Sequence, residues 1–149
     1  MTFTVAIATS LLVMSAAGLA SSSSFNLITQ DEARLPPALQ EEHPFELRTA
    51  GPRIVVRSPL DGGEYDGPID VDVEFSPGPS GLLVKDETLR VTYLKLVQID
   101  LTGRLRPYFQ KDRLHVESVN IPAGRHRISL SIADEGGYTS VASLSFVVH

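Results

Sequence analysis

Two groups of side chains in this sequence are of the types that bind metal ions. His115 and Glu117 are two residues apart, so on a β-strand they would project from the same face, where an imidazole and a carboxylate could bind a metal ion. Asp61 and Asp66 lie in a glycine-rich acidic loop, and their oxygens are of the type that binds Ca²⁺. However, the loop lacks the Asp-x-Asp-x-Asp-Gly spacing, and acidic loop residues are often turn formers. We therefore predict no bound cofactor, and metal binding by these four residues is the alternative.

The motifs of the common catalytic mechanisms are missing from the sequence. The chain contains no Cys, which excludes disulfides, thiolate metal sites and a cysteine nucleophile. It has no Gly-x-Ser-x-Gly motif and no glycine-rich phosphate loop, and residues 134–137 (Asp-Glu-Gly-Gly) are typical of a hairpin turn between strands. No pair of carboxylates has the apolar surroundings that would separate their pKa values. We therefore predict that the protein is not an enzyme.

Charge is unevenly distributed along the chain. There are 18 acidic and 13 basic side chains, and this balance disfavours nucleic-acid binding, which needs a basic surface. Six acids and no base fall within residues 61–74, whereas six bases and two acids fall within residues 104–127. In an immunoglobulin-like sandwich the acidic strand at residues 70–74 and the strand with Arg125 and Arg127 would belong to opposite sheets.

The basic residues form the candidate surface for binding a partner protein. Residues 100–111 combine leucines and aromatic residues with arginines, and long loops on rigid sandwiches often carry recognition. The predicted partner-binding residues are Arg104, Arg106, Tyr108, Arg125 and Arg127. Two alternatives remain open. The apolar residues of 100–111 would plug one end of the sandwich, and the charges would be ordinary solvated faces that prevent aggregation.

From residue 51 onward, short apolar runs alternate with clusters of Gly, Pro and Asp, which is typical of β-strands joined by turns. The clearest alternation is in residues 69–75, where apolar residues alternate with acidic ones, so that one face of the strand would be apolar and the other acidic. His126 shares the inward phase of Ile128 and is expected at the rim of the sandwich. The pattern predicts an all-β, antiparallel sandwich of about seven strands over residues 51–149, with a helical turn from Thr102. The predicted strands are residues 53–57, 69–75, 88–99, 113–119, 125–132 and 139–148.

The first fifty residues differ in composition from the rest. Residues 5–20 form an apolar run that ends in small residues, as signal peptides do, although residues 1–4 lack the usual basic residue. The run is short for a membrane span, so we predict a signal peptide at residues 1–20, a periplasmic or secreted product, and no stable membrane insertion after cleavage. Residues 21–50 are expected to be a flexible tail or linker that adds little to the core. A helical turn near Asp31, capped by Asp31 or Thr29, is also expected.

The last third of the sequence resembles the ending of bacterial immunoglobulin-like and fibronectin-III-like domains. Residues 122–137, Pro-Ala-Gly-Arg-His-Arg-Ile-Ser-Leu-Ser-Ile-Ala-Asp-Glu-Gly-Gly, look like the turn, penultimate strand and Asp-Gly hairpin of that family. Ser58-Pro59 followed by Gly62-Gly63 looks like the exit from its first strand. The resemblance covers residues 53–148 and implies an immunoglobulin-like sandwich with binding, spacing or assembly roles outside the cytoplasm. The Cys pair and core Trp of antibody-type domains are missing, which excludes that branch.

Together these patterns predict a bacterial, non-enzymatic binding or assembly module whose partner is another envelope or secreted protein. It would act through a basic sheet face and the segment 100–111. The alternative is a periplasmic protein that binds a metal or a small ligand. The sequence does not indicate an oligomeric state.

Overall fold

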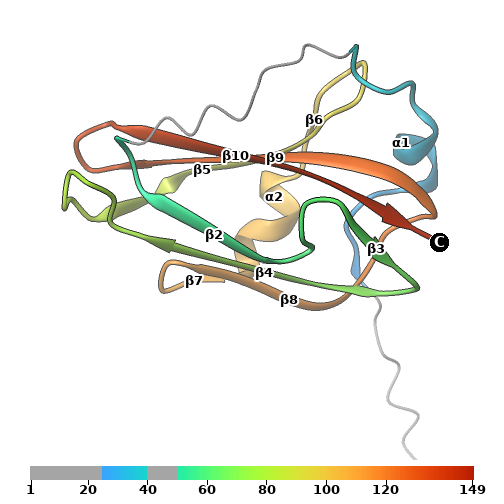
Figure 1. The fold of residues 1–149 in the computed structure, drawn as a ribbon, viewed down its shortest axis with the longest axis horizontal. Helices are drawn as coiled ribbons and strands as arrows, with labels where there is room; N and C mark the ends of the chain where they lie inside the picture. The colour runs from blue at the N-terminus through green and yellow to red at the C-terminus, as the bar shows by residue number, and fades with distance from the viewer. Residues whose placement is uncertain (1–24, 40–49) are drawn as a thin grey trace, which may run out of the picture.

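The computed structural model describes residues 25–39 and 50–149, so the predicted signal peptide lies outside the described residues. These residues form two β-sheets that lie against each other as two layers, consistent with a β-sandwich (Figure 1). Sheet I contains, in spatial order, β1 (Phe25–Asn26), β8 (Arg113–Asn120), β4 (Ile69–Ser76) and β2 (Arg53–Ser58), with β7 (Phe109–Gln110) also paired to β8. Sheet II contains β3 (Gly63–Tyr65), β10 (Thr139–Val148), β9 (Gly124–Asp134), β5 (Val84–Tyr93) and β6 (Ile99–Asp100).

The long strands pair antiparallel, as predicted, and two short strands add parallel pairs. β1 lies parallel to β8, and β3 lies parallel to β10. The described residues also contain α1 (Gln30–Arg34), α2 (Thr102–Leu105) and the 3₁₀ helix η1 (Arg106–Tyr108). Within the described part of the chain, each helix is too short to cross a bilayer.

The alternation predicted for the main strands is observed in their side chains. In β4 the apolar residues from Ile69 to Phe75 are buried, whereas the acids between them lie on the outer side. β9 and β10 follow the same rule. Buried residues of both sheets form one hydrophobic cluster, so apolar burial holds the two layers together. The cluster members from β9 and β10 are Ile128, Leu130, Ile132, Leu144, Phe146 and Val148.

The six predicted strands each overlap a long strand, and the largest difference falls within residues 88–99. β5 begins earlier, at Val84, and ends at Tyr93, and β6 then folds back to pair with the end of β5. The prediction of one continuous strand there was wrong. Residues 94–98 connect the two strands, and Leu96 and Val97 are exposed. The apolar run of residues 88–99 therefore includes an exposed connection.

Residues 25–39 pack onto the sandwich, which corrects the prediction that this part of the segment 21–50 adds little to the core. Leu27 and Ile28 are 1% and 2% exposed. The predicted helical turn is α1, and its cap is reciprocal: the Thr29 hydroxyl accepts from the Glu32 amide, and the Glu32 carboxylate accepts from the Thr29 amide. Two adjacent apolar residues have no period, so the sequence pattern could not indicate their burial.

The segment 100–111 carries the chain from sheet II to sheet I and fills the space between the layers on that side (Figure 1). Leu101 and Leu105 are completely buried. The Val91 amide donates to the Thr102 hydroxyl at 2.9 Å, which ties α2 to β5. The helical turn predicted at Thr102 is confirmed, and the burial of both leucines supports the interpretation of this segment as a plug.

Candidate functional site

The outer face of sheet II, which we call the basic face, carries short hydroxyl side chains together with arginines. The strand register places Ser143, Ser129 and Thr92 side by side across β10, β9 and β5. Because successive strand residues point to opposite faces, these side chains project away from the core, as do the arginines beside them. The surface is therefore polar and carries three arginines, and the register places Asp100 and Glu64 on the same face at its two edges. It comprises Arg90, Thr92, Arg125, Arg127, Ser129, Ser131 and Ser143.

The arginines of the basic face differ in how they are neutralised. Arg90 lies 3.8 Å from the Asp100 carboxylate, and both side chains are mostly exposed, so this pair contributes little. Arg125 and Arg127 form no ion pair with any of the residues that the structure describes. The structure thus brings these two predicted residues together on one strand, without an ion pair to any described residue.

The outer face of sheet I has a different arrangement, because two of the three acids of β4, Asp72 and Glu74, are paired with arginines on the neighbouring strands, and the third, Asp70, accepts from the Ser118 amide at 2.8 Å. The Arg57 guanidinium donates to the Glu74 carboxylate at 2.6 Å. Arg113 donates twice to Asp72, at 2.8 Å each, and this contact holds the pKa of the Asp72 carboxyl below its usual range. The acidic strand is therefore largely compensated within its own sheet, and the separation of acids and Arg125/Arg127 onto opposite sheets is confirmed.

Arg104, Arg106 and Tyr108 lie on the connection between the sheets, in contacts separate from those of the basic face. Arg104 donates to both carboxylate oxygens of Glu32, at 2.6 and 2.9 Å, and to the Leu27 carbonyl at 2.6 Å. These bonds lower the pKa of Glu32 to about 2. Tyr108 packs its ring against Phe25 at 5.2 Å between centroids, whereas Arg106 is exposed. Arg104 thus holds the α1 segment against α2.

The predicted metal ligands lie at two separate places. His115 has one ring nitrogen 3.9 Å from Asp72 and the other 3.5 Å from Glu117. Asp61 accepts a hydrogen bond from the Ser145 amide at 2.7 Å, and Asp66 is exposed in the loop after β3. In the described parts of the chain, no three His, Asp or Glu side chains are grouped as a metal site would need.

His126 is buried in the core between Tyr93 and Phe146, not at the rim as predicted. Its Nε2 lies 2.8 Å from the Pro122 carbonyl, so Nε2 carries the proton and donates, and Nδ1 accepts from the Tyr93 hydroxyl at 3.0 Å. Burial lowers the pKa of His126 and raises the pKa of Tyr93 to about 12. Every polar atom of this pair is used internally, which favours a structural role over catalysis.

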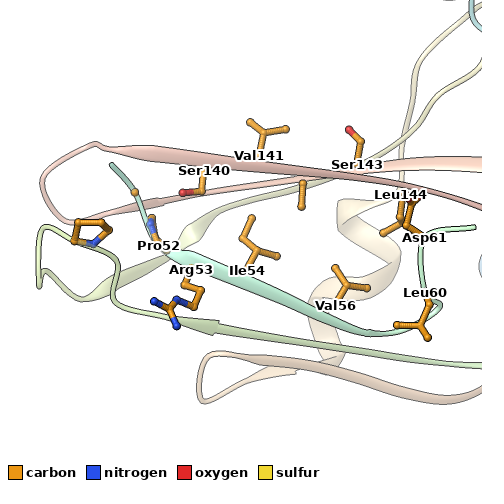
Figure 2. Close-up of a pocket in the computed structure, with 13 residues that line it drawn as sticks. Pro52, Arg53, Ile54, Val56, Leu60, Asp61, Ser140, Val141, Ser143 and Leu144 are labelled. Atoms are coloured by element: carbon orange, nitrogen blue, oxygen red, sulfur yellow. The ribbon is translucent and has the colours of Figure 1, made fainter. Parts of the chain in front are cut away.

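A cleft of about 480 Å³ lies between β2 and β10, on the opposite side of the sandwich from α2 (Figure 2). Ile54 and Val56 point from β2 toward β10, and Leu144 contributes from β10. Leu60 and Asp61 lie near one end of the cleft and Pro52 near the other, and Pro79 is also part of the lining. No sequence pattern indicated this cleft, because its walls are the edges of two strands 80 or more residues apart in the chain.

Comparisons with known proteins do not assign the chain to a family. No family model matches it, and no curated protein matches it. Among solved structures, the chain is similar to the endo-beta-1,4-mannanase from Thermotoga petrophila, with 16% sequence identity and a TM-score of 0.45. The match covers 66% of this chain and 20% of the mannanase chain, so the chain spans about a fifth of that protein's length.

Proposed function

We propose that this protein is a non-enzymatic, exported, immunoglobulin-like module that binds another envelope or secreted protein through the basic face. Export rests on the apolar run at residues 5–20 and the small residues that follow it. The immunoglobulin-like assignment is supported by the two-sheet architecture together with the sequence resemblance over residues 53–148.

The observation that carries the proposal is the contrast between the two outer faces. On sheet I, Asp72 and Glu74 of β4 have arginine partners, Arg113 on β8 and Arg57 on β2. On sheet II, Arg125 and Arg127 have no carboxylate partner among the described residues, and the serines beside them are short enough to let a partner approach. Complementary charge on a flat face directs association and orientation more than it adds affinity. The partner expected here is therefore an acidic protein surface.

The proposed contact set is narrower than the five residues predicted from the sequence. Arg104 is committed to Glu32 and to the Leu27 carbonyl, and Tyr108 packs on Phe25. Their substitution would disturb the fold and would not report on a partner. Arg106 is exposed on η1 and serves as the internal comparison for the segment 100–111.

The test is a charge reversal with a matched control. The full-length wild-type protein is compared with two variants, Arg125→Glu/Arg127→Glu and the control Arg106→Glu/Lys111→Glu. The two variants change the net charge by the same amount. Each protein is immobilised to capture proteins from envelope extract of the producing cells. We expect a stoichiometric partner that is retained by wild type and by the control, and is reduced at least tenfold by the reversal on β9. Equal capture by all three proteins would refute the basic face, and loss only in the control would place binding on the segment 100–111.

A further inference from the structure

The strand that forms the upper wall of the cleft in Figure 2, β10, has an open backbone edge. The Ser145 amide donates to Asp61 and its carbonyl accepts from the Gly62 amide, so Ser145 directs its backbone groups away from β9. Backbone direction alternates along an antiparallel strand, so Val141 and Ser143 point the same way. Within the described part of the chain, nothing pairs with the backbone groups of these two residues.

The opposite wall, β2, also has an edge to which no described strand pairs. The Phe75 amide donates to the Asp112 carbonyl, on the side of β4 that faces β8. Phe75 is the register partner of Ile54, so the backbone groups of Ile54 point away from β4, and those of Val56 do the same. The side chains of Ile54 and Val56 are only half buried and form an apolar floor for the cleft.

The β10 edge already accepts a strand at its far end. β3 lies parallel to β10 and pairs with residues from Phe146 to Val148. The chain reaches this edge at Leu60 and Asp61, just before β3, and the cleft begins there. The cleft therefore continues the line of β3 along the same edge. At its other end Gly51 packs against the backbone of Tyr138 and Thr139, which limits the length of an added strand.

We propose that this cleft binds an extended segment of another protein, which adds to the edge of β10 as a further strand of sheet II. Its backbone would pair with Val141 and Ser143, and alternate apolar side chains would fill the space over Ile54, Val56 and Leu144. The intervening side chains would lie on the basic face, where Arg127, on the strand next to β10, favours acidic or hydroxyl residues by charge complementarity. This site goes beyond the proposed function, since it does not require the basic face to bind a folded partner.

Peptide selection on the full-length chain tests the proposal. A library of random eight-residue peptides is selected against the immobilised protein, and the best sequence is synthesised and measured by titration. The selected peptides are expected to alternate apolar residues with acidic or hydroxyl ones. Val56→Lys, which places a charge in the cleft, is expected to weaken binding at least tenfold. Val55→Lys, which places the same charge on the outer face of sheet I, is the matched control and is expected to bind like wild type.

Backbone pairing has its own pair of variants. Ser143→Pro removes the amide that points into the cleft without removing a hydrogen bond to β9, and we expect at least a tenfold loss of peptide affinity. Ser143→Ala keeps that amide and is expected to bind like wild type. No enrichment of peptides on wild type over Val56→Lys, or equal binding by all four variants, would overturn the proposal.

Amide hydrogen exchange of the wild-type protein decides the question even if a variant fails to fold. In the free chain, Val141 and Ser143 amides should exchange faster than those of Ala142 and Leu144, which face β9, and the peptide should slow the first pair. Slow exchange at Val141 and Ser143 in the free monomer would mean that the chain fills its own edge. Slow exchange only in a dimer would make a second copy the occupant. Protection of Ile54 and Val56 by the peptide would place the strand on sheet I. Each of these three results contradicts the proposal.

Discussion

His126 is the residue whose protonation the fold resists most clearly. It is 1% exposed, and its two ring nitrogens are hydrogen-bonded to Pro122 and Tyr93. The positive charge of Lys95 also disfavours a second positive charge on the imidazole. Lys95 is itself held by the Ala33 carbonyl at 2.9 Å, with its charge 5.2 Å from the Tyr93 ring centroid. Burial lowers the pKa of His126, and the positive charge of Lys95 lowers it further, whereas the hydrogen bond to Pro122 raises it. The balance favours the neutral imidazole.

The first prediction concerns pH. Because the pKa of His126 is lower in the folded chain than the ordinary value of 6.5, the unfolded state takes up a proton first as pH falls. The stability that neutral His126 contributes is complete above pH 6.5 and declines below it. The free energy of unfolding from urea titrations should therefore fall between pH 7.5 and pH 5.5. His126→Phe, although less stable overall, should show a shallower decline, and an equally steep decline in the variant would contradict this account.

At the scale of elements, α1 depends on one ion pair for its attachment. The α1 helix has only five residues, which is too short for stability on its own, and Arg104 joins it through Glu32 and Leu27 to the connection between the sheets. The side chains of Arg104 and Glu32 are 35% and 18% exposed, so the contact is partly shielded from water.

Replacing Arg104 tests the attachment of α1. Arg104→Met keeps most of the aliphatic length and removes the charge, which leaves the Glu32 carboxylate without its strongest partner. We expect the free energy of unfolding at pH 7 to decrease by about 1–3 kcal/mol. Arg106→Met, two residues after Arg104 in the same connection and exposed, should change it by less than about 0.5 kcal/mol. Similar losses in both variants, measured by urea unfolding, would show that the contact does not stabilise the fold.

The sequence predicted those elements whose periodicity extends over enough residues. Residues 69–75, 125–132 and 139–148 alternate long enough to define both a strand and its buried face, and β4, β9 and β10 follow. β1 and β3 have two and three residues, too few for any period, so their places at the sheet edges are decided by tertiary pairing. His126 was placed on the correct face but at the wrong depth, because depth depends on Tyr93 and Phe146 from neighbouring strands.

The candidate site could be predicted only in part, for the same reason. Alternation indicated that the acids of β4 and the arginines of β9 face outward on different sheets. Which charges remain unpaired depends on register, since Asp72 meets Arg113 across 41 residues of sequence and Glu74 meets Arg57 across 17. The cleft depends on two strand edges that meet only in the folded chain. No local pattern encodes either feature.

At the scale of the whole molecule, the two outer faces have different electrostatic character. On sheet I, Asp72 and Glu74 are paired with arginines from its own strands, and sheet II carries Arg125 and Arg127 without such partners among the described residues. The chain as a whole has a formal charge of −5, so the basic face is a local departure from the net charge. A partner directed by charge should therefore approach sheet II and leave the outer face of sheet I exposed.

Site-specific photo-crosslinking in the producing cells is the most direct test of whether a partner binds the basic face. A benzophenone side chain placed at Ser129, in the middle of the basic face, is compared with the same group at His115, in the middle of the outer face of sheet I. The account predicts a discrete cross-linked partner from Ser129, lost when Arg125→Glu/Arg127→Glu is added, and none from His115. The same partner cross-linked from His115, or a Ser129 adduct that survives the charge reversal, would contradict it.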